Sequence, residues 1–338
     1  AWAHASARRH SWRGLALYGV DGSTVRVPDS PENRKTFGSS NAGRRGKGGY
    51  PLVRLVTLMA LRSHLLAAAR LGPYKVSERK HARDMWPTVP DESLTIVDRG
   101  FVYAKDLIPL HAQGTHRHWL SRARKNMKWR TVKRHAKGDA LVEILVNRAS
   151  RQQDPTLPER WTMRAIRYHR RGFREQTLLT SLVDSNQYPA SEIVALYHER
   201  WELELGFDEV KTEMLEREEA IRSQSPQGVE QELWGLGLAY NLVRLEMEHA
   251  AALAEVPPTR ISFIAGLRAI RMDLVRYVFG SPSKLAKRVE ALRRELAQYV
   301  LPLRRSHRRY PRAVKIKMSN YPRKRTRVTG GTRRAFAK

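Results

Sequence analysis

The chain contains no cysteine, which excludes disulfide bonds and thiolate metal sites. Any metal must therefore be held by oxygen or imidazole ligands. Long apolar runs are also missing, because no stretch approaches the roughly 20 consecutive apolar residues of a membrane-spanning helix. No signal peptide opens the chain. We therefore expect no membrane partner. The 12 histidines lack ligand spacings such as His-Glu-x-x-His, so none of them is assigned to a metal.

Acidic residues are few relative to basic ones. The 338 residues include 63 Lys and Arg against 33 Asp and Glu, which gives a formal net charge of +30. This excess is far above what solubility requires and predicts a polyanionic partner, for which nucleic acid is the best fit. The hydrophobic fraction of 41% suffices for the buried core of one large domain or two ordinary ones. We expect a globular, cytoplasmic protein associated with the nucleoid.

Two aspartates follow β-prone runs. Residues 14–27, GLALYGVDGSTVRV, predict two short strands joined by a turn at Asp21, and LTIVD at 94–98 predicts a strand that ends on Asp98. Between them, the apolar segment 50–72 predicts buried strands of a sheet. Aspartates at the ends of neighbouring strands would converge on one edge of that sheet. A single aspartate of this kind is usually a turn former, so the signal lies in the combination.

Periodicity and turn-forming residues indicate the remaining elements. Residues 117–182 alternate short apolar runs with charged stretches, which is typical of a mostly antiparallel β region. The Gly-rich segment 39–51 predicts a flexible loop, and the residues from 304 onward predict a partly disordered basic tail. The basic residues 44–47 and the tail could track a DNA backbone. Helices are predicted at 76–85, 103–111, 190–215, 229–254, 259–278 and 283–299, with Ser191 as the N-cap of the third.

The predicted helix 190–215 carries a third acid. At about 100° per residue, four of its side chains fall within a stripe of roughly 60°. They are Tyr197, Arg200, Glu204 and Lys211. Apolar residues flank this stripe, so Glu204 is predicted to be a carboxylate among core positions. The other acids, Glu199, Glu202, Glu209 and Glu213, point to the opposite face. On this helix alone, Glu204 either pairs with Arg200 four residues earlier or binds a metal.

The three acids together favour the metal. Hard divalent cations such as Mg²⁺ take oxygen ligands, and two of them can clamp the attacking and leaving oxygens of an in-line phosphoryl displacement. Asp21, Asp98 and Glu204 would supply these ligands. Proteins that do this chemistry on DNA also need positive charge near the acids, and Arg200 and Lys211 would provide it.

These residues resemble a known family. The segment YHERWELELGFDEVK reproduces the Tyr-x2-Arg-x3-Glu-x6-Lys signature of DDE insertion-sequence transposases, and VDGSTVRVPD and VDRGF resemble the blocks around their first and second aspartates. The match spans residues 14–215. It implies an α/β, RNase H-like mixed sheet flanked by helices, interrupted by a mainly antiparallel β insertion and followed by a helical C-terminal region. The implied division is 1–122 and 177–225 for the catalytic core, 123–176 for the insertion, 226–303 for the helical region and 304–338 for the basic tail.

The resemblance also implies residue roles. The catalytic and metal-binding residues would be Asp21, Asp98 and Glu204, holding two Mg²⁺ ions that Mn²⁺ can replace. The DNA contacts would be Tyr197, Arg200 and Lys211. The implied reaction is hydrolysis at transposon ends followed by transfer of the 3′-OH into target DNA, as in cut-and-paste transposition. The implied partner is double-stranded DNA, bound by a homodimer in the synaptic complex.

Two features depart from the family pattern. Some relatives place a tryptophan just before the strand that corresponds to LLTSLVD and use it to stabilise a flipped base during hairpin formation, but Gln176 stands here. Trp129 or Trp161 could replace it by stacking, or could belong to the core. Only 20 residues precede Asp21, where relatives carry a DNA-binding region. One expectation is therefore a fragment that lacks end recognition.

Two other functions remain open. The same acids would support an RNase H-like nuclease that cuts DNA without joining it, and transfer of 3′-OH ends to a second DNA separates this activity from transposition. The charge alone would support a catalytically inactive DNA-binding protein, whose behaviour toward DNA would not change with Mg²⁺ or with Asp98→Asn.

Overall fold

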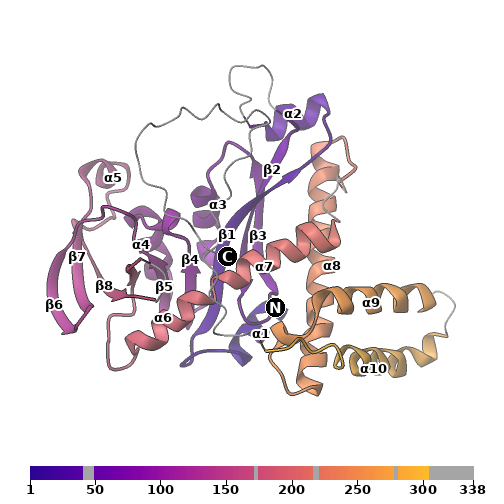
Figure 1. Ribbon diagram of the computed structural model, residues 1–338. Helices are drawn as coiled ribbons and strands as arrows, with labels where there is room; N and C mark the ends of the chain where they lie inside the picture. Colours follow the sequence, from indigo (N-terminus) through magenta and orange to yellow (C-terminus); the bar gives the residue numbers. More distant parts are fainter. Residues whose placement is uncertain (41–48, 171–173, 216–220, 278–280, 304–338) are drawn as a thin grey trace, which may run out of the picture. The chain divides into compact units, whose positions relative to one another are not determined.

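The apolar runs of the chain assemble into one mixed sheet of nine strands, in the order β3-β2-β1-β4-β5-β9-β8-β7-β6 (Figure 1). The structure is a computed structural model that describes residues 1–40, 49–170, 174–215, 221–277 and 281–303. The strands are β1 (Ala16–Arg26), β2 (Leu52–Ala60), β3 (Leu66–Pro73), β4 (Ser93–Val97), β5 (Arg117–Arg122), β6 (Arg130–Ala136), β7 (Asp139–Leu145), β8 (Arg160–Tyr168) and β9 (Gln176–Thr180). The basic residues 44–47 and the tail from 304 lie outside the described residues.

Helices cover the sheet on both faces (Figure 1). They are α1 (Trp2–Arg9), α2 (Pro31–Phe37), α3 (Glu78–Met85), α4 (Ala104–Ala112), α5 (Arg148–Gln153), α6 (Ala190–His198), α7 (Trp201–Asp208), α8 (Pro226–Leu253), α9 (Phe263–Tyr277) and α10 (Leu285–Leu296). The helices predicted at 76–85 and 103–111 correspond to α3 and α4. Those predicted after residue 226 correspond to α8, α9 and α10, with shifted ends. No helix among the described ranges is long and apolar enough to cross a membrane.

Alternation along β1 creates two cores. Tyr18 and Val20 pack with α3 residues such as Met85 on one face of the sheet. Leu17 belongs to the core on the other face, which includes Leu203 of α7. Successive side chains of a strand point to opposite faces, so a strand buried on both faces reads as a nearly continuous apolar run. The mixed sheet flanked by helices is thus confirmed, and so is the helical region that follows it.

The prediction of a turn at Asp21 is wrong. Asp21 lies in the middle of β1, where its partner across the antiparallel ladder is Thr57 of β2. The Asp-Gly pair is a local turn signal, but nine consecutive register pairs with β2 hold this segment extended. Tertiary pairing therefore overrides the local preference.

The predicted antiparallel region is present and continues the same sheet. β6, β7, β8 and β9 pair antiparallel in turn, and β9 also pairs antiparallel with β5. β5 is the exception within residues 117–182, because it runs parallel to β4. The short helix α5, between β7 and β8, was not predicted.

The helix predicted at 190–215 is interrupted. α6 ends at His198, α7 begins at Trp201, and residues Glu209–Met214 form a π-helical turn. The backbone N–H groups of Glu199 and Arg200 donate to carbonyls three residues earlier, which tightens the chain between the two helices. Ser191 is not the N-cap, because Pro189 occupies that position and makes no side-chain capping bond.

Candidate active site

Asp21 and Asp98 lie next to each other because of the register between two parallel strands. Val20 of β1 is paired with Val97, the last residue of β4, so both aspartates follow at the same level. Beyond this point β1 continues without β4 beside it. β1 rises to α2 at the top of Figure 1, and β4 and β5 run parallel to it, so this is the upper edge of the sheet. The predicted convergence of the two aspartates on one edge follows from this register, although Asp21 does not end its strand.

Asp21 lies in an unfavourable environment for a negative charge. Burial raises the pKa of its carboxyl to about 6, and the nearby carboxylates of Glu78 and Asp98 add to the rise. A hydrogen bond of 2.8 Å from the backbone N–H of Gly22 and the charge of Arg200 oppose it. Burial is thus the main reason why the carboxylate form of Asp21 is disfavoured, and neighbouring acids contribute to it.

Glu78 is an acid of this edge that the sequence did not reveal. It is the first residue of α3 and accepts a hydrogen bond of 2.5 Å from Arg54 of β2. Its side chain packs directly on Gly22, where an added Cβ atom would lie 2.4 Å from Cγ of Glu78. One signal in the sequence could have revealed it. Glu78 lies in the first turn of α3, and α3 follows β3, a strand that ends at this edge of the sheet.

Glu204 faces outward and is paired with Arg200. An oxygen of Glu204 accepts a hydrogen bond of 2.8 Å from the guanidinium of Arg200, and 42% of the Glu204 side chain is exposed. The prediction that Glu204 is enclosed among core positions is therefore wrong, and the ion pair with Arg200 is present. Among the residues that the structure describes, no three acidic, histidine or cysteine side chains are grouped closely enough to hold a metal.

Tyr197 and Arg200 connect this helix to Asp98. Tyr197 is buried, and burial raises the pKa of its phenol, whereas the charges of Arg200 and Arg122 lower it. The charge of Asp98 acts on both Tyr197 and Arg200. The aromatic and cationic groups of the predicted stripe thus lie beside the second aspartate.

Lys211 lies beside the first aspartate. Its Nζ atom is 3.0 Å from Oγ of Ser23, which is two residues from Asp21 and therefore on the same face of β1. Lys211 reaches this position from the π-helical turn, and such turns are frequent at functional sites. The predicted stripe is therefore kept in space even though the helix is interrupted.

The acids on the opposite face of this helix are the enclosed ones. Glu199 pairs with Arg62, Glu202 with His64, and Glu209 with both His64 and Arg244. The side chains of His64 and Arg244 are each 2% exposed, and the buried charge of Arg244 depends on the Glu209 carboxylate. These pairs attach the helix to the turn after β2 and to α8.

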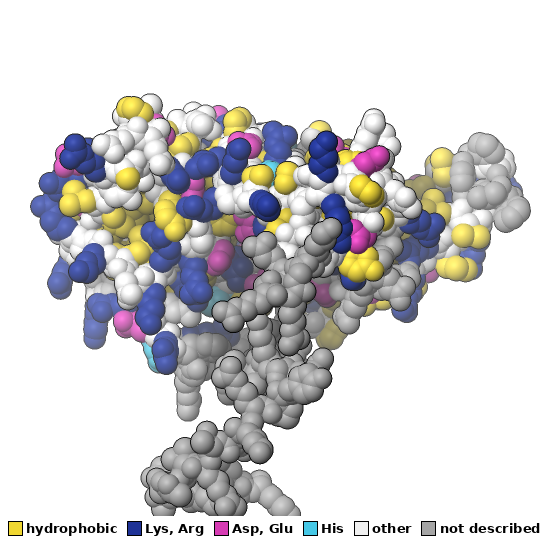
Figure 2. Space-filling view, turned by 90° about the horizontal axis from the view of Figure 1, so that it is seen from above, with side chains coloured by type: hydrophobic (Ala, Val, Ile, Leu, Met, Phe, Trp, Pro, Cys, Tyr) yellow, Lys and Arg dark blue, Asp and Glu magenta, His cyan; other side chains and the backbone are white. Residues whose placement is uncertain are grey.

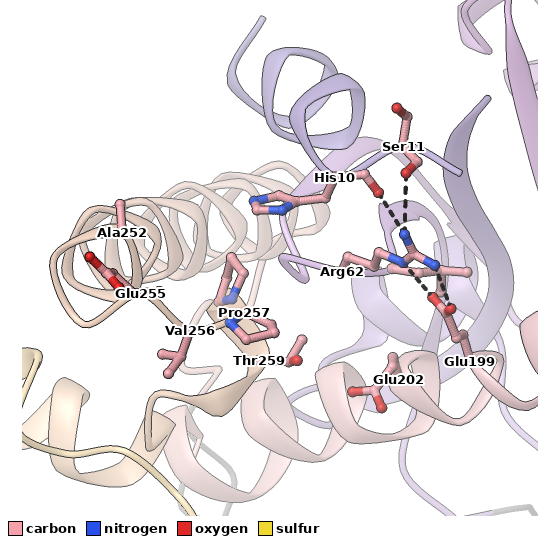
Figure 3. A pocket seen from close by; sticks show the side chains of 13 residues that line it. His10, Ser11, Arg62, Glu199, Glu202, Ala252, Glu255, Val256, Pro257 and Thr259 are labelled. Atoms are coloured by element: carbon pink, nitrogen blue, oxygen red, sulfur yellow. Dashed lines mark hydrogen bonds and ion pairs between the residues drawn. The ribbon is translucent and has the colours of Figure 1, made fainter. Parts of the chain in front are cut away.

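A cavity of about 610 Å³ lies at the other edge of the sheet, where β2 ends (Figure 3). Arg62 lines this cavity and donates hydrogen bonds of 3.0 and 3.3 Å to the backbone oxygens of His10 and Ser11. Figure 3 shows the same guanidinium bound to both carboxylate oxygens of Glu199. This cavity holds neither Asp21 nor Asp98, and its Arg62–Glu199 pair serves to anchor the helix.

The two tryptophans singled out in the insertion differ. Trp161 is buried and packs against Trp119 with ring centroids 5.3 Å apart, so it belongs to the core. Trp129 is half-buried and lines a groove of about 430 Å³ together with Arg134 and Arg167. Gln176 accepts a hydrogen bond of 3.1 Å from the hydroxyl of Tyr168.

Basic side chains predominate over acidic ones on the upper side of the molecule. Figure 2 shows this side from above, with Lys and Arg in dark blue predominating over Asp and Glu in magenta.

Comparison with known proteins identifies the family. The profile of the Transposase DDE domain family matches residues 14–242. The chain is 37% identical over 327 residues to "Transposase InsG for insertion sequence element IS4" of Escherichia coli (strain K12), covering 95% of this chain and 72% of InsG. It is 43% identical over 120 residues to the protein InsZ of the same strain, covering 35% of this chain and 40% of InsZ.

A more distant structural likeness exists to the piggyBac transposase, solved as a synaptic complex with hairpin DNA. The TM-score is 0.44 and the sequence identity is 11%, and the match covers 85% of this chain and 57% of the piggyBac chain. The family assignment rests on the profile and on InsG, which together extend over most of the chain. This chain therefore belongs to the DDE transposases of insertion sequences.

Proposed function

We propose that the chain catalyses metal-dependent hydrolysis of DNA at transposon ends and transfer of the resulting 3′-OH into target DNA, with Asp21, Asp98 and Glu204 as catalytic residues. One observation carries this proposal. The register of β1 and β4 sets Asp21 and Asp98 side by side at an edge where Arg200 and Lys211 are also present. Homology to the transposase InsG supports DNA transposition as the overall process.

The acids fit a divalent cation. Burial and two neighbouring carboxylates raise the pKa of Asp21, so a cation bound there would relieve this unfavourable environment. Carboxylate oxygens are the ligands that Mg²⁺ and Mn²⁺ take. Glu204 would join this set by turning away from Arg200, which its exposure allows. When bound, the two ions would stabilise negative charge on the attacking and leaving oxygens.

The cationic residues of the stripe would bind the DNA. Arg200, once released by Glu204, can donate two parallel hydrogen bonds to a phosphate, and Lys211 offers a compact charge beside Asp21. Tyr197 is buried and would position Arg200 rather than contact DNA charge directly. The proposed partner is double-stranded DNA at the nucleoid, held by a homodimer that brings two transposon ends together.

Cleavage of supercoiled plasmid tests the first step. The purified chain is incubated with Mg²⁺, with Mn²⁺ or with EDTA, beside the variants Asp98→Asn and Asp91→Asn. Asp91 precedes β4 at its opposite end, where it pairs with Arg117, and so serves as the matched control. Nicking that requires metal, that Asp98→Asn abolishes and that Asp91→Asn retains supports the three-carboxylate site. Equal nicking by both variants contradicts it.

Strand transfer separates transposition from simple nuclease activity. A labelled duplex that carries a transposon end with a free 3′-OH is incubated with the protein and an unlabelled plasmid. Covalent transfer of label to the plasmid supports transposition, whereas nicking without transfer supports the nuclease alternative. A folded protein that binds DNA equally with and without metal, and never nicks it, supports the inactive alternative.

A further inference from the structure

Three residues at the edge of the sheet where β4 ends form a stack of two cations on one aromatic ring. The Cζ atom of Arg79 lies 4.0 Å from the centroid of the Tyr103 ring, and that of Arg124 lies 3.9 Å from it. Two guanidinium groups cannot both occupy one side of a ring at such distances, so they stack on its opposite faces. Each gains a cation–π interaction, and both positive charges are held within a few ångströms of the same ring.

The stack lies at the same edge of the sheet as the paired aspartates. Tyr103 precedes α4 and is joined to Asp98 by the 3-10 helix Arg99–Phe101. Arg124 follows β5, whose carboxyl end is next to that of β4. Arg122, the last residue of β5, acts on the same Tyr197 phenol as Asp98 does. The stack is therefore adjacent to the candidate active site and separate from its acids.

The two arginines differ in how their charges are compensated. Arg79 donates a hydrogen bond of 3.2 Å to Asp106, a buried carboxylate that Arg83 also contacts at 3.0 Å. Arg124 pairs with no carboxylate of the residues that the structure describes, and its Nε atom is buried without a hydrogen-bond partner among them. Other enclosed arginines, Arg54, Arg62, Arg164 and Arg244, each bind a carboxylate.

An uncompensated and partly buried guanidinium is unfavourable unless an anion completes it. Stacking on Tyr103 fixes the plane of the group and leaves the N–H donors of its two terminal nitrogens for the two oxygens of one phosphate. We propose that Arg124, held by Tyr103 and backed by Arg79, binds a backbone phosphate of the DNA strand that passes the aspartates. This inference rests on the proposed function, because it assumes that DNA is the substrate at this edge.

DNA affinity measured without divalent metal tests the proposal. Fluorescence anisotropy of a labelled duplex is recorded in EDTA over a series of salt concentrations for Arg124→Gln, Arg124→Lys and the control Arg13→Gln. Arg13 precedes β1 at the opposite edge and is already paired with Glu192. Arg124→Gln is expected to weaken binding roughly tenfold and to reduce the slope of log K against log salt by about 1. Arg124→Lys, which keeps the charge, should recover the slope but only part of the affinity.

Variants of the ring separate a phosphate contact from a structural role. Tyr103→Phe keeps the stacking surface and should bind like the parent, whereas Tyr103→Leu should weaken binding as Arg124→Gln does. Inorganic phosphate, compared with chloride at matched ionic strength, should compete with DNA for the parent protein more than for Arg124→Gln. If Arg124→Gln is folded and matches Arg13→Gln in affinity and salt slope, the proposal is overturned.

The two proposals fail in different ways. Binding that depends on Arg124 without any metal-dependent nicking would contradict the catalytic proposal and leave the phosphate site in place. Nicking that Asp98→Asn abolishes, together with full DNA affinity in Arg124→Gln, would overturn the phosphate site alone.

Discussion

The ammonium group of Lys211 lies 3.0 Å from the hydroxyl oxygen of Ser23, on the face of β1 that also carries Asp21. Because a hydroxyl does not neutralise a cation, this charge remains available to a DNA phosphate. Lys211→Gln should therefore weaken duplex binding several-fold and lower the salt slope by about 1. Ser23→Ala, which removes only the hydroxyl, should bind normally. Anisotropy titrations compare the two variants, and equal effects would assign Lys211 a structural role.

Asp21 should reduce stability in the absence of metal. Burial and the carboxylates of Glu78 and Asp98 disfavour its charge at neutral pH, so Asp21→Asn should raise the free energy of unfolding by on the order of 3 kcal/mol, at 1.36 kcal/mol per pKa unit. Thermal unfolding in EDTA measures this gain. Adding Mn²⁺ should raise the Tm of the parent more than that of Asp21→Asn. An equal rise in both proteins would argue against a cation at Asp21.

Gly22 should tolerate no side chain while Glu78 is in place. A Cβ atom there would lie 2.4 Å from Cγ of Glu78, whose carboxylate Arg54 holds. Gly22→Ala is therefore expected to destabilise the protein by about 1–3 kcal/mol through overpacking. In a double-mutant cycle of chemical unfolding, Glu78→Ala should remove much of that loss. Gly235→Ala, at a helix position with open space, is the control and should be neutral or stabilising. Additive effects at Gly22 and Glu78 would refute the contact.

Removing only one partner of the Arg244–Glu209 pair should destabilise the protein strongly. Arg244 is buried and binds Glu209, while Tyr240 donates a hydrogen bond of 2.8 Å to the same carboxylate. Arg244→Met leaves that acid with only His64 and Tyr240 as partners and without the guanidinium charge, and should lower the free energy of unfolding by about 3–5 kcal/mol. The double variant Arg244→Met, Glu209→Gln should be more stable than Arg244→Met alone. Urea unfolding of the three proteins decides this, and a less stable double variant would contradict the expectation.

Glu248 should make stability depend on pH in the acidic range. Burial raises the pKa of its carboxyl, but hydrogen bonds from His10 and Arg9 outweigh burial and lower the pKa from 4.5 to about 2. Because this pKa is lower in the folded than in the unfolded protein, ionised Glu248 stabilises the folded state at pH values above about 4.5. This stabilisation is lost as the pH falls from about 4.5 to about 2. Glu248→Gln should therefore cost about 3 kcal/mol at pH 7, at 1.36 kcal/mol per unit. The difference from the parent, followed by chemical unfolding, should shrink below pH 4.5. A constant difference across this range would point to packing instead.

The sequence located the two aspartate blocks but not the conformation around the first. Asp98 was placed correctly because LTIVD is a short apolar run with a clear end. Asp21 was misplaced because an Asp-Gly pair is judged on local preference, whereas its extended conformation depends on β2, which is distant in sequence. How close the two aspartates lie in space depends on the register between β1 and β4. Composition and periodicity do not predict this register.

The helix stripe was predictable, but its surroundings were not. Spacing alone placed Tyr197, Arg200 and Lys211 on one face of a helix, and the structure brings these three residues to the side of the aspartates. The interruption after His198 has no proline or glycine to signal it. Glu78 and Arg124 lie outside the sequence blocks that resemble the family, so the sequence did not single them out. Their positions at this edge result from the tertiary fold rather than from a local sequence pattern.

Hydrogen bonding of β9 to β5 on one side and to β8 on the other makes the insertion an extension of the sheet that carries the two aspartates. Neighbouring strands of a sheet are rotated by about 20–25°, so the four steps from β4 to β7 accumulate a turn of roughly 80–100°. At this average twist, we expect the groove lined by Trp129 to lie at a steep angle to the line of the aspartates. A straight duplex cannot follow both surfaces, and we expect DNA that touches both to curve as it crosses the protein.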